Sequence, residues 1–124
     1  MNRFLLPFLL LLAASIAPLA LAGAPGPVPP GNYNCHKLSG GSLITLATLE
    51  IKGQTYRFTN EEPFAPFAVD GAGKITWSKG VSFLPDGWKL TASEYQGLVN
   101  GRPMINIRYV SGSGNHDVID CTRE

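Results

Sequence analysis

The two histidines and the acids near them are the first residues with types suited to chemistry. His36 and His116 are the only histidines in the chain, and Asp117 and Asp120 follow the second. An imidazole beside a carboxylate is a general acid–base pair, and the same groups bind transition metals. Metal ligands usually lie closer together in sequence, so we expect no metal and no cofactor. A catalytic role for these residues requires the two ends of the chain to meet.

Other catalytic arrangements find little support in the sequence. Glu61–Glu62 precedes a proline-rich stretch typical of a solvated loop, and a hydrolase needs two carboxylates held across a cleft. The segment Gly112–Gly114 places a serine between glycines, but it lacks the G-x-S-x-G pattern and the strand-to-helix setting of a nucleophile elbow. We therefore predict no catalytic residues and a protein that is not an enzyme.

Binding is a better use for the remaining distinctive side chains. Arg102 and Arg108 alternate along one expected strand, where they form either an anion-binding row or a solvated face. Trp88 follows a turn, where a tryptophan is either a recognition anchor or a lid over the core. The candidate binding surface comprises Trp77, Lys79, Trp88, Arg102 and Arg108.

The first residues read as an export signal. Residues 1–22 combine Arg3, an apolar run over 4–12 and small residues at Ala20 and Ala22, the pattern of a cleaved secretory leader. An uncleaved membrane anchor is the alternative, because the apolar stretch has about the length of a short span. We expect a periplasmic or extracellular protein without a membrane segment after cleavage.

After the leader, residues 23–31 form a Pro/Gly-rich linker and residues 32–124 a single β domain. The chain has ten Lys and Arg residues; without Arg3 nine remain, against nine Asp and Glu. A neutral domain without a basic run gives no electrostatic reason to bind nucleic acid or an anionic membrane.

Cys35 and Cys121 lie near opposite ends of the exported part. In an oxidising compartment a lone cysteine pair forms a disulfide, so we expect a bond that joins the first strand to the last. Both cysteines fall on the apolar side of alternating segments, where the bond would be buried.

Turn residues divide the chain into seven or eight short strands. Gly53-Gln54 predicts a type II′ hairpin with Ile51 opposite Tyr56 and Leu49 opposite Phe58, on the face away from Glu50 and Arg57. A hairpin over 70–74 is expected to pair Val69 with Ile75 and Phe67 with Trp77. Asn100-Gly101 marks another hairpin with an open register, because a strict two-residue loop faces Ile105 with Gln96. The fold class is therefore all-β, a small antiparallel barrel or sandwich, and the expected linkage of first and last strands favours the barrel.

Part of the chain resembles the periplasmic inhibitors of c-type lysozyme. The resemblance is carried by Tyr33-x-Cys35, by LEIKGQTYRF over 49–58, and by Trp77-Ser78-Lys79-Gly80 with Leu84. It implies an eight-stranded barrel closed by a terminal disulfide. In that family a serine- and glycine-rich loop ending in an aromatic residue enters the lysozyme active site; the corresponding residues 69–74 contain neither the serine nor the aromatic residue. The resemblance thus implies the fold more directly than the activity.

Two functions follow from these observations. The first is an exported, non-enzymatic β domain with a binding or envelope-associated role, whose partner is a protein, a glycan or a small molecule. The alternative is a protein inhibitor of a lysozyme-like cell-wall hydrolase.

Overall fold

A computed structural model describes residues 26–124, which form eight strands. The predicted leader and linker residues 23–25 lie outside the described part. Within residues 26–124 no helix is long and apolar enough to cross a membrane. The strands are β1 Gly31–Ser39, β2 Ser42–Lys52, β3 Thr55–Arg57, β4 Ala65–Val69, β5 Ile75–Trp77, β6 Trp88–Val99, β7 Arg102–Ser111 and β8 His116–Arg123.

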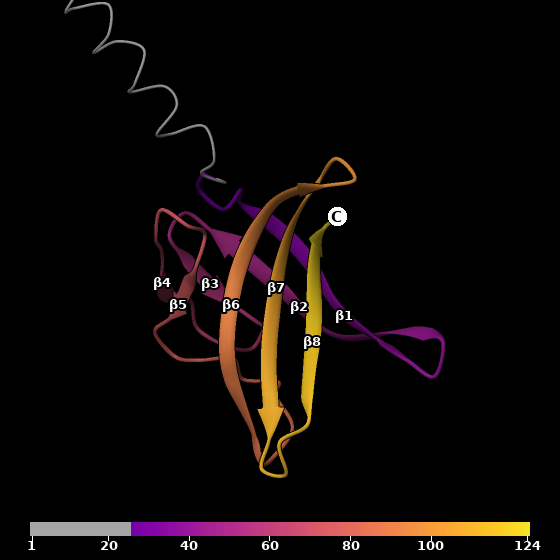
Figure 1. Cartoon of the computed structure of the whole chain (residues 1–124). Coiled ribbons are helices and arrows are strands. Elements are labelled where there is room, and N and C mark those ends of the chain that lie inside the picture. The colour runs from indigo at the N-terminus through magenta and orange to yellow at the C-terminus, as the bar shows by residue number, and fades with distance from the viewer. Residues whose placement is uncertain (1–25) are drawn as a thin grey trace, which may run out of the picture.

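The strands form one antiparallel sheet that curls into a nearly closed barrel (Figure 1). Their order is β5-β4-β3-β2-β1-β8-β7-β6, so sequence neighbours lie side by side except for β5 and β6 at the two ends of the sheet, and β1 lies beside β8. The ends of the sheet meet at one bridge between Lys74 and Glu94, where the Tyr95 amide donates a 2.7 Å hydrogen bond to the Gly73 carbonyl. The predicted all-β fold is confirmed, and a barrel is formed.

The first predicted hairpin has the expected register. Ile51 lies opposite Tyr56, and on the outer side Glu50 pairs with Arg57 through a 2.8 Å ion pair. Gly53 has a φ of +61°, as the first central residue of a type II′ turn requires. The ladder stops at Arg57, so the expected pairing of the buried Leu49 and Phe58 side chains is not part of it.

The hairpin over 70–74 also matches its prediction. Val69 faces Ile75, and Gly73 takes a φ of +89° at the end of the loop. The Asp70 carboxylate accepts hydrogen bonds from the amides of Ala72 and Lys74, both at 2.9 Å, and so holds the turn compact.

The hairpin at Asn100-Gly101 shows how its open register is resolved. Both turn residues have positive φ (53° and 80°), so the loop is the two-residue type I′. A bulge in β6 places Gln96 and Gly97 against one residue of β7, and this extra residue moves Tyr95 opposite Ile105. An apolar pair therefore replaces the Gln96–Ile105 pair that a regular ladder would form.

The interior of the barrel is filled by side chains that alternate inward from every strand. The largest fully buried ones are Tyr33, Leu49, Ile51, Phe58, Ile105, Ile107, Tyr109 and Ile119. Tyr56, Phe58 and Trp77 add an aromatic cluster with ring centroids 4.6–5.5 Å apart. Side chains therefore occupy the centre of the barrel.

The predicted disulfide joins β1 to β8. Cys35 and Cys121 lie directly opposite each other, both are fully buried, and their sulfurs are 2.01 Å apart. Part of the predicted linker contacts the barrel, because Val28 is buried and the Pro29 carbonyl accepts a 2.7 Å hydrogen bond from the Tyr33 hydroxyl.

Candidate functional site

The two tryptophans of the candidate binding surface lie mainly against the core. Trp77 is 6% exposed, and its indole Nε1–H donates a 2.7 Å hydrogen bond to the buried Ser93 hydroxyl. Trp88 is half-buried and packs edge-on against Tyr109, with ring centroids 5.0 Å apart. Trp77 is thus a core residue, and Trp88 has the position of the lid rather than of a free anchor.

The basic residues of that surface are separated from one another. Arg102 and Arg108 lie six positions apart on β7, which corresponds to about 20 Å along a strand. Between them the Asn106 amide donates to the Asp120 carboxylate, so a negative group interrupts the row. Lys79 lies elsewhere, in a hollow beside the β3 and β4 strands. The three basic residues line three different surface hollows.

The first and last strands do meet, but the two histidines do not. His36 faces Asp120 across the β1–β8 ladder, whereas His116 faces Val110 on the opposite side of β8. The two histidines line different surface hollows. Over residues 26–124 no group of three or more His, Cys, Asp or Glu side chains is arranged to hold a metal ion.

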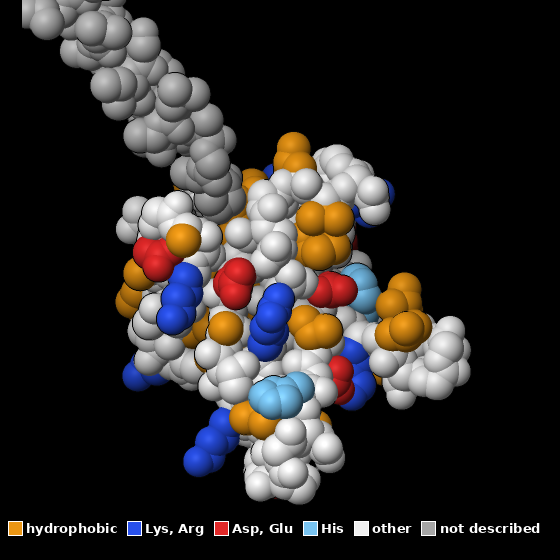
Figure 2. All heavy atoms as spheres, in the orientation of Figure 1, with side chains coloured by type: hydrophobic (Ala, Val, Ile, Leu, Met, Phe, Trp, Pro, Cys, Tyr) orange, Lys and Arg blue, Asp and Glu red, His pale blue; other side chains and the backbone are white. Residues whose placement is uncertain are grey.

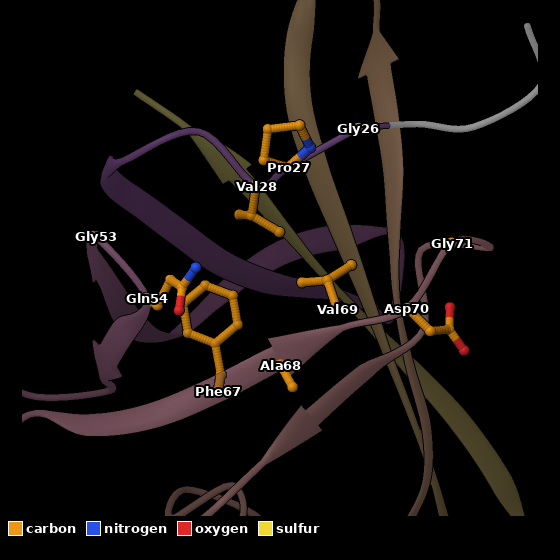
Figure 3. Close-up of a pocket in the computed structure, with 10 residues that line it drawn as sticks. All are labelled: Gly26, Pro27, Val28, Gly53, Gln54, Phe67, Ala68, Val69, Asp70 and Gly71. Carbon is orange, nitrogen blue, oxygen red and sulfur yellow. The ribbon is translucent and has the colours of Figure 1, made fainter. Parts of the chain in front are cut away.

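A hollow of about 500 Å³ lies beside the β4–β5 hairpin (Figure 3). The side chains of Val28, Phe67 and Val69 lie toward one another in it, and Gly53 and Gly71 mark its ends. Its one acidic residue is Asp70, whose carboxylate already caps the adjacent turn. The hollow therefore combines apolar side chains with a single carboxylate that is engaged in the turn.

The most unusual surface is a hairpin that projects from the barrel, which we call the arm (residues 37–48; Figure 1). It extends beyond the barrel because β8 pairs with β1 only as far as His36, and β3 pairs with β2 only from Glu50 onward. Gly40 and Gly41 form its tip, with φ of +58° and +83° suited to a type I′ turn.

Exposed apolar side chains are concentrated on the arm, as Figure 2 shows at the right of the molecule. Four of the seven large hydrophobic residues exposed in the described structure belong to it. These are Leu38 and Leu43 at 69% exposure each, Ile44 at 43% and Leu46 at 39%. A leucine exposed alone is ordinary, whereas several on one short hairpin are unusual.

Register places the two most exposed leucines together. Leu38 lies directly opposite Leu43, and His36 lies opposite Thr45 on the same outer face. Leu46 is the extra residue of a bulge, since Cys35 faces Ala47 while His36 already faces Thr45. Beside the leucine pair lies a surface hollow of about 530 Å³, lined by Asn34, His36, Leu43, Thr45, Arg102, Thr122, Arg123 and Glu124.

Ionic and covalent contacts hold the base of the arm. Lys37 forms a 2.8 Å ion pair with Asp117, and the Tyr109 hydroxyl donates to the same carboxylate at 3.1 Å. The hydrogen bond from Lys37 is the main cause that lowers the pKa of Asp117, and it raises the pKa of Lys37 in return. The disulfide at Cys35 lies two residues before Lys37. The arm therefore starts from a fixed base.

Our sequence reasoning missed the arm, although a signal for it is present. No charged residue occurs between Lys37 and Glu50, and this stretch contains the apolar run of β2. Such a run also fits a buried strand. Its exposure becomes clear only in the structure, where β8 and β3 end before they reach the arm.

The described structure is thus a small up-and-down antiparallel barrel with one projecting apolar hairpin. Comparison of the chain with protein-family models, curated proteins and solved structures found no match.

Proposed function

We propose that this protein is an exported, non-enzymatic domain that binds another protein through the outer face of the arm. The observation that carries the proposal is the Leu38–Leu43 pair, whose members are 69% exposed on a hairpin with a fixed base. Protein interfaces gain most of their affinity from a few apolar or aromatic anchors surrounded by polar groups.

The hollow beside the leucine pair supports a partner of mixed chemistry. Thr45 and Thr122 offer hydroxyls there, and Arg102 offers a charged donor at its edge. A suitable partner segment presents an apolar side chain to the leucines and an acceptor oxygen to Arg102. The filled barrel supports a macromolecular partner over a small molecule held inside.

Export is supported by two independent features. Residues 1–22 have the charge and apolar pattern of a leader, and the domain contains a disulfide. The proposed location is periplasmic or extracellular.

The test is a pull-down with the chain expressed with its own leader and purified oxidised after export. Envelope and medium extracts provide the prey, and mass spectrometry identifies what is retained. Leu38→Asp/Leu43→Asp is expected to reduce retention of the partner at least about tenfold, since each change places a charge at the anchor. Leu98→Asp is the matched control, because Leu98 is 67% exposed on β6. Equal retention by both variants would refute a role for the arm.

A second candidate, inhibition of a lysozyme-like hydrolase, is favoured by one observation. The eight-stranded barrel with a disulfide between its near-terminal strands is the fold that the sequence resemblance implies. The turn at Asp70–Lys74 is compact and held by its own carboxylate, so an inhibitory contact would come more readily from the arm. Full lysozyme activity in the presence of roughly 100 µM protein would exclude this candidate.

A further inference from the structure

We propose that the free edge of β2 in the arm pairs with the same edge of a second copy of this chain. The two arms then form a four-stranded antiparallel sheet around a two-fold axis at Ile44. The inference rests on the proposed function because both use the arm, but they use different parts of it. The partner binds the outer face, whereas the second copy binds the edge.

The edge in question has no strand beside it in the described structure. β1 covers one side of β2 along its whole length, but on the other side β3 reaches only Glu50–Lys52. Along residues 42–48 the backbone N–H and C=O groups that point to that side therefore lack a strand partner within residues 26–124. An unpaired edge of this kind is a template for another strand.

The edge also lacks the residues that normally protect it. Proteins prevent edge pairing with lysines, prolines or inward-pointing charges. From Leu38 to Leu49 the chain has no charged residue and no proline. By contrast, β6, which makes only one bridge on its outer side, contains Lys89 and Glu94. The absence of protecting residues on this edge of β2 indicates that another strand covers it in the assembled protein.

The sequence of the edge is complementary to itself. A two-fold axis at Ile44 places this side chain opposite its counterpart and Leu43 opposite Thr45 of the other copy, with each pair on one face of the sheet. No charges are brought together at the junction. The nearest like charges are the two Lys37 side chains, which would lie three strand spacings apart, about 14 Å. Each is already paired with an Asp117 carboxylate, so self-repulsion is small.

Pairing of the edges has a consequence for the outer face. A two-fold axis perpendicular to the sheet keeps both outer faces on the same side. The Leu38–Leu43 pairs of the two arms then lie on one side of the four-stranded sheet, in adjacent rows that Thr45 and His36 complete. This display of two leucine pairs on one surface is a second reason to favour a copy of the chain over a foreign strand as the occupant of the edge.

The experiment measures the mass of the oxidised, exported protein by sedimentation and light scattering over a range of concentrations. Wild-type protein is expected to form a dimer, and Ile44→Glu and Ile44→Lys are each expected to weaken association at least tenfold, because like charges then meet at the axis. Mixing the two variants is expected to restore a heterodimer. Leu98→Lys is the control and is expected to remain dimeric, since Leu98 lies on β6 outside the arm. A melting curve for each variant verifies that the barrel is folded.

Three outcomes would overturn the inference. They are a wild type that is monomeric at every concentration, a dimer that persists in both Ile44 variants, and a mixture of Ile44→Glu with Ile44→Lys that forms no heterodimer. None of these affects the pull-down, which reads the outer face. Conversely, equal retention of the partner by Leu38→Asp/Leu43→Asp and by Leu98→Asp, with the dimer intact, would refute the proposed function alone.

Discussion

Tyr33 connects the entering chain to the barrel through a single hydroxyl. Its side chain is fully buried, and the hydroxyl donates to the Pro29 carbonyl at 2.7 Å. Burial, with a smaller contribution from the nearby Tyr95, raises the pKa of the Tyr33 phenol to about 12. Below the ordinary tyrosine pKa the Tyr33 phenol is protonated in both the folded and the unfolded chain. The hydroxyl therefore stabilises the fold as a neutral group.

The raised pKa predicts a specific alkaline sensitivity. Above pH 10 the unfolded phenol ionises while the folded one stays neutral, so its contribution is lost as the pH rises toward 12. Tyr33→Phe should cost about 1 kcal/mol at neutral pH, because the hydrogen bond is removed. The difference in the free energy of unfolding between wild type and Tyr33→Phe should become smaller by about pH 11. Denaturant unfolding at both pH values measures this, and a constant gap would show that Tyr33 ionises equally in both states.

Among the secondary-structure elements, the β1–β2 hairpin has two parts with different environments. Its lower part belongs to the barrel, where Leu49 and Ile51 are buried. Its upper part, the arm, makes few contacts with other elements apart from those at its base. The Lys37–Asp117 pair at that base therefore affects the orientation of the arm more than the stability of the barrel, since both side chains are about 30% exposed.

Removal of this ion pair should loosen the arm. Asp117→Asn is expected to lower the free energy of unfolding by less than about 1 kcal/mol at pH 7, and to speed amide exchange in residues 37–48. The lowered pKa of Asp117 means that its contribution is present above the ordinary carboxyl range and is lost as the pH falls through the lowered value. Wild type and variant should therefore converge in acid.

Glu50→Gln is the matched control for that prediction. It removes the similarly exposed ion pair with Arg57, which lies on the barrel part of the same hairpin. Its cost in stability should be comparable, while exchange in the arm should remain unchanged. Equal exchange rates in Asp117→Asn and Glu50→Gln would mean that Lys37 does not position the arm.

For the whole molecule, closure of the barrel depends on two unequal seams. β1 and β8 form a regular ladder with a buried disulfide, whereas β5 and β6 meet at a single bridge. The disulfide joins residues 86 positions apart, so it restricts nearly all of the folded chain when that chain unfolds.

Removal of the disulfide should therefore be the most damaging of these changes. Cys35→Ala/Cys121→Ala is expected to lower the free energy of unfolding by about 2–5 kcal/mol, and the melting temperature by roughly 10–30 °C. The strand signal in circular dichroism should survive at low temperature, because the core is otherwise intact. A melting curve unchanged by the substitutions or by a reductant would contradict the stabilising role.

Local sequence was sufficient wherever neighbouring residues decide the structure. Turn residues and alternation predicted the hairpins at Gly53 and at 70–74 with their registers, and they identified Cys35 and Cys121 as an inward-facing pair. The register of the hairpin at Asn100-Gly101 could not be predicted, because the bulge at Gln96–Gly97 depends on how β6 packs against β7. The candidate site was harder to predict, since Trp77 and Trp88 carry no local signal that separates a core or lid position from an anchor.

The sequence by itself determined the all-β class, most of the turns and the disulfide pair, because these depend on backbone preferences and on two cysteines with one partner each. Only the tertiary structure decided that the sheet curls into a nearly closed barrel, that Trp77 lies inside it and that residues 37–48 project from it. The physical reason is that exposure depends on long-range pairing, which decides where a bulge forms and how far neighbouring strands extend. Leu43 and Leu49 lie on the same strand, yet Leu43 is 69% exposed because the bulge at Leu46 turns it to the outer face, whereas Leu49 is buried in the barrel.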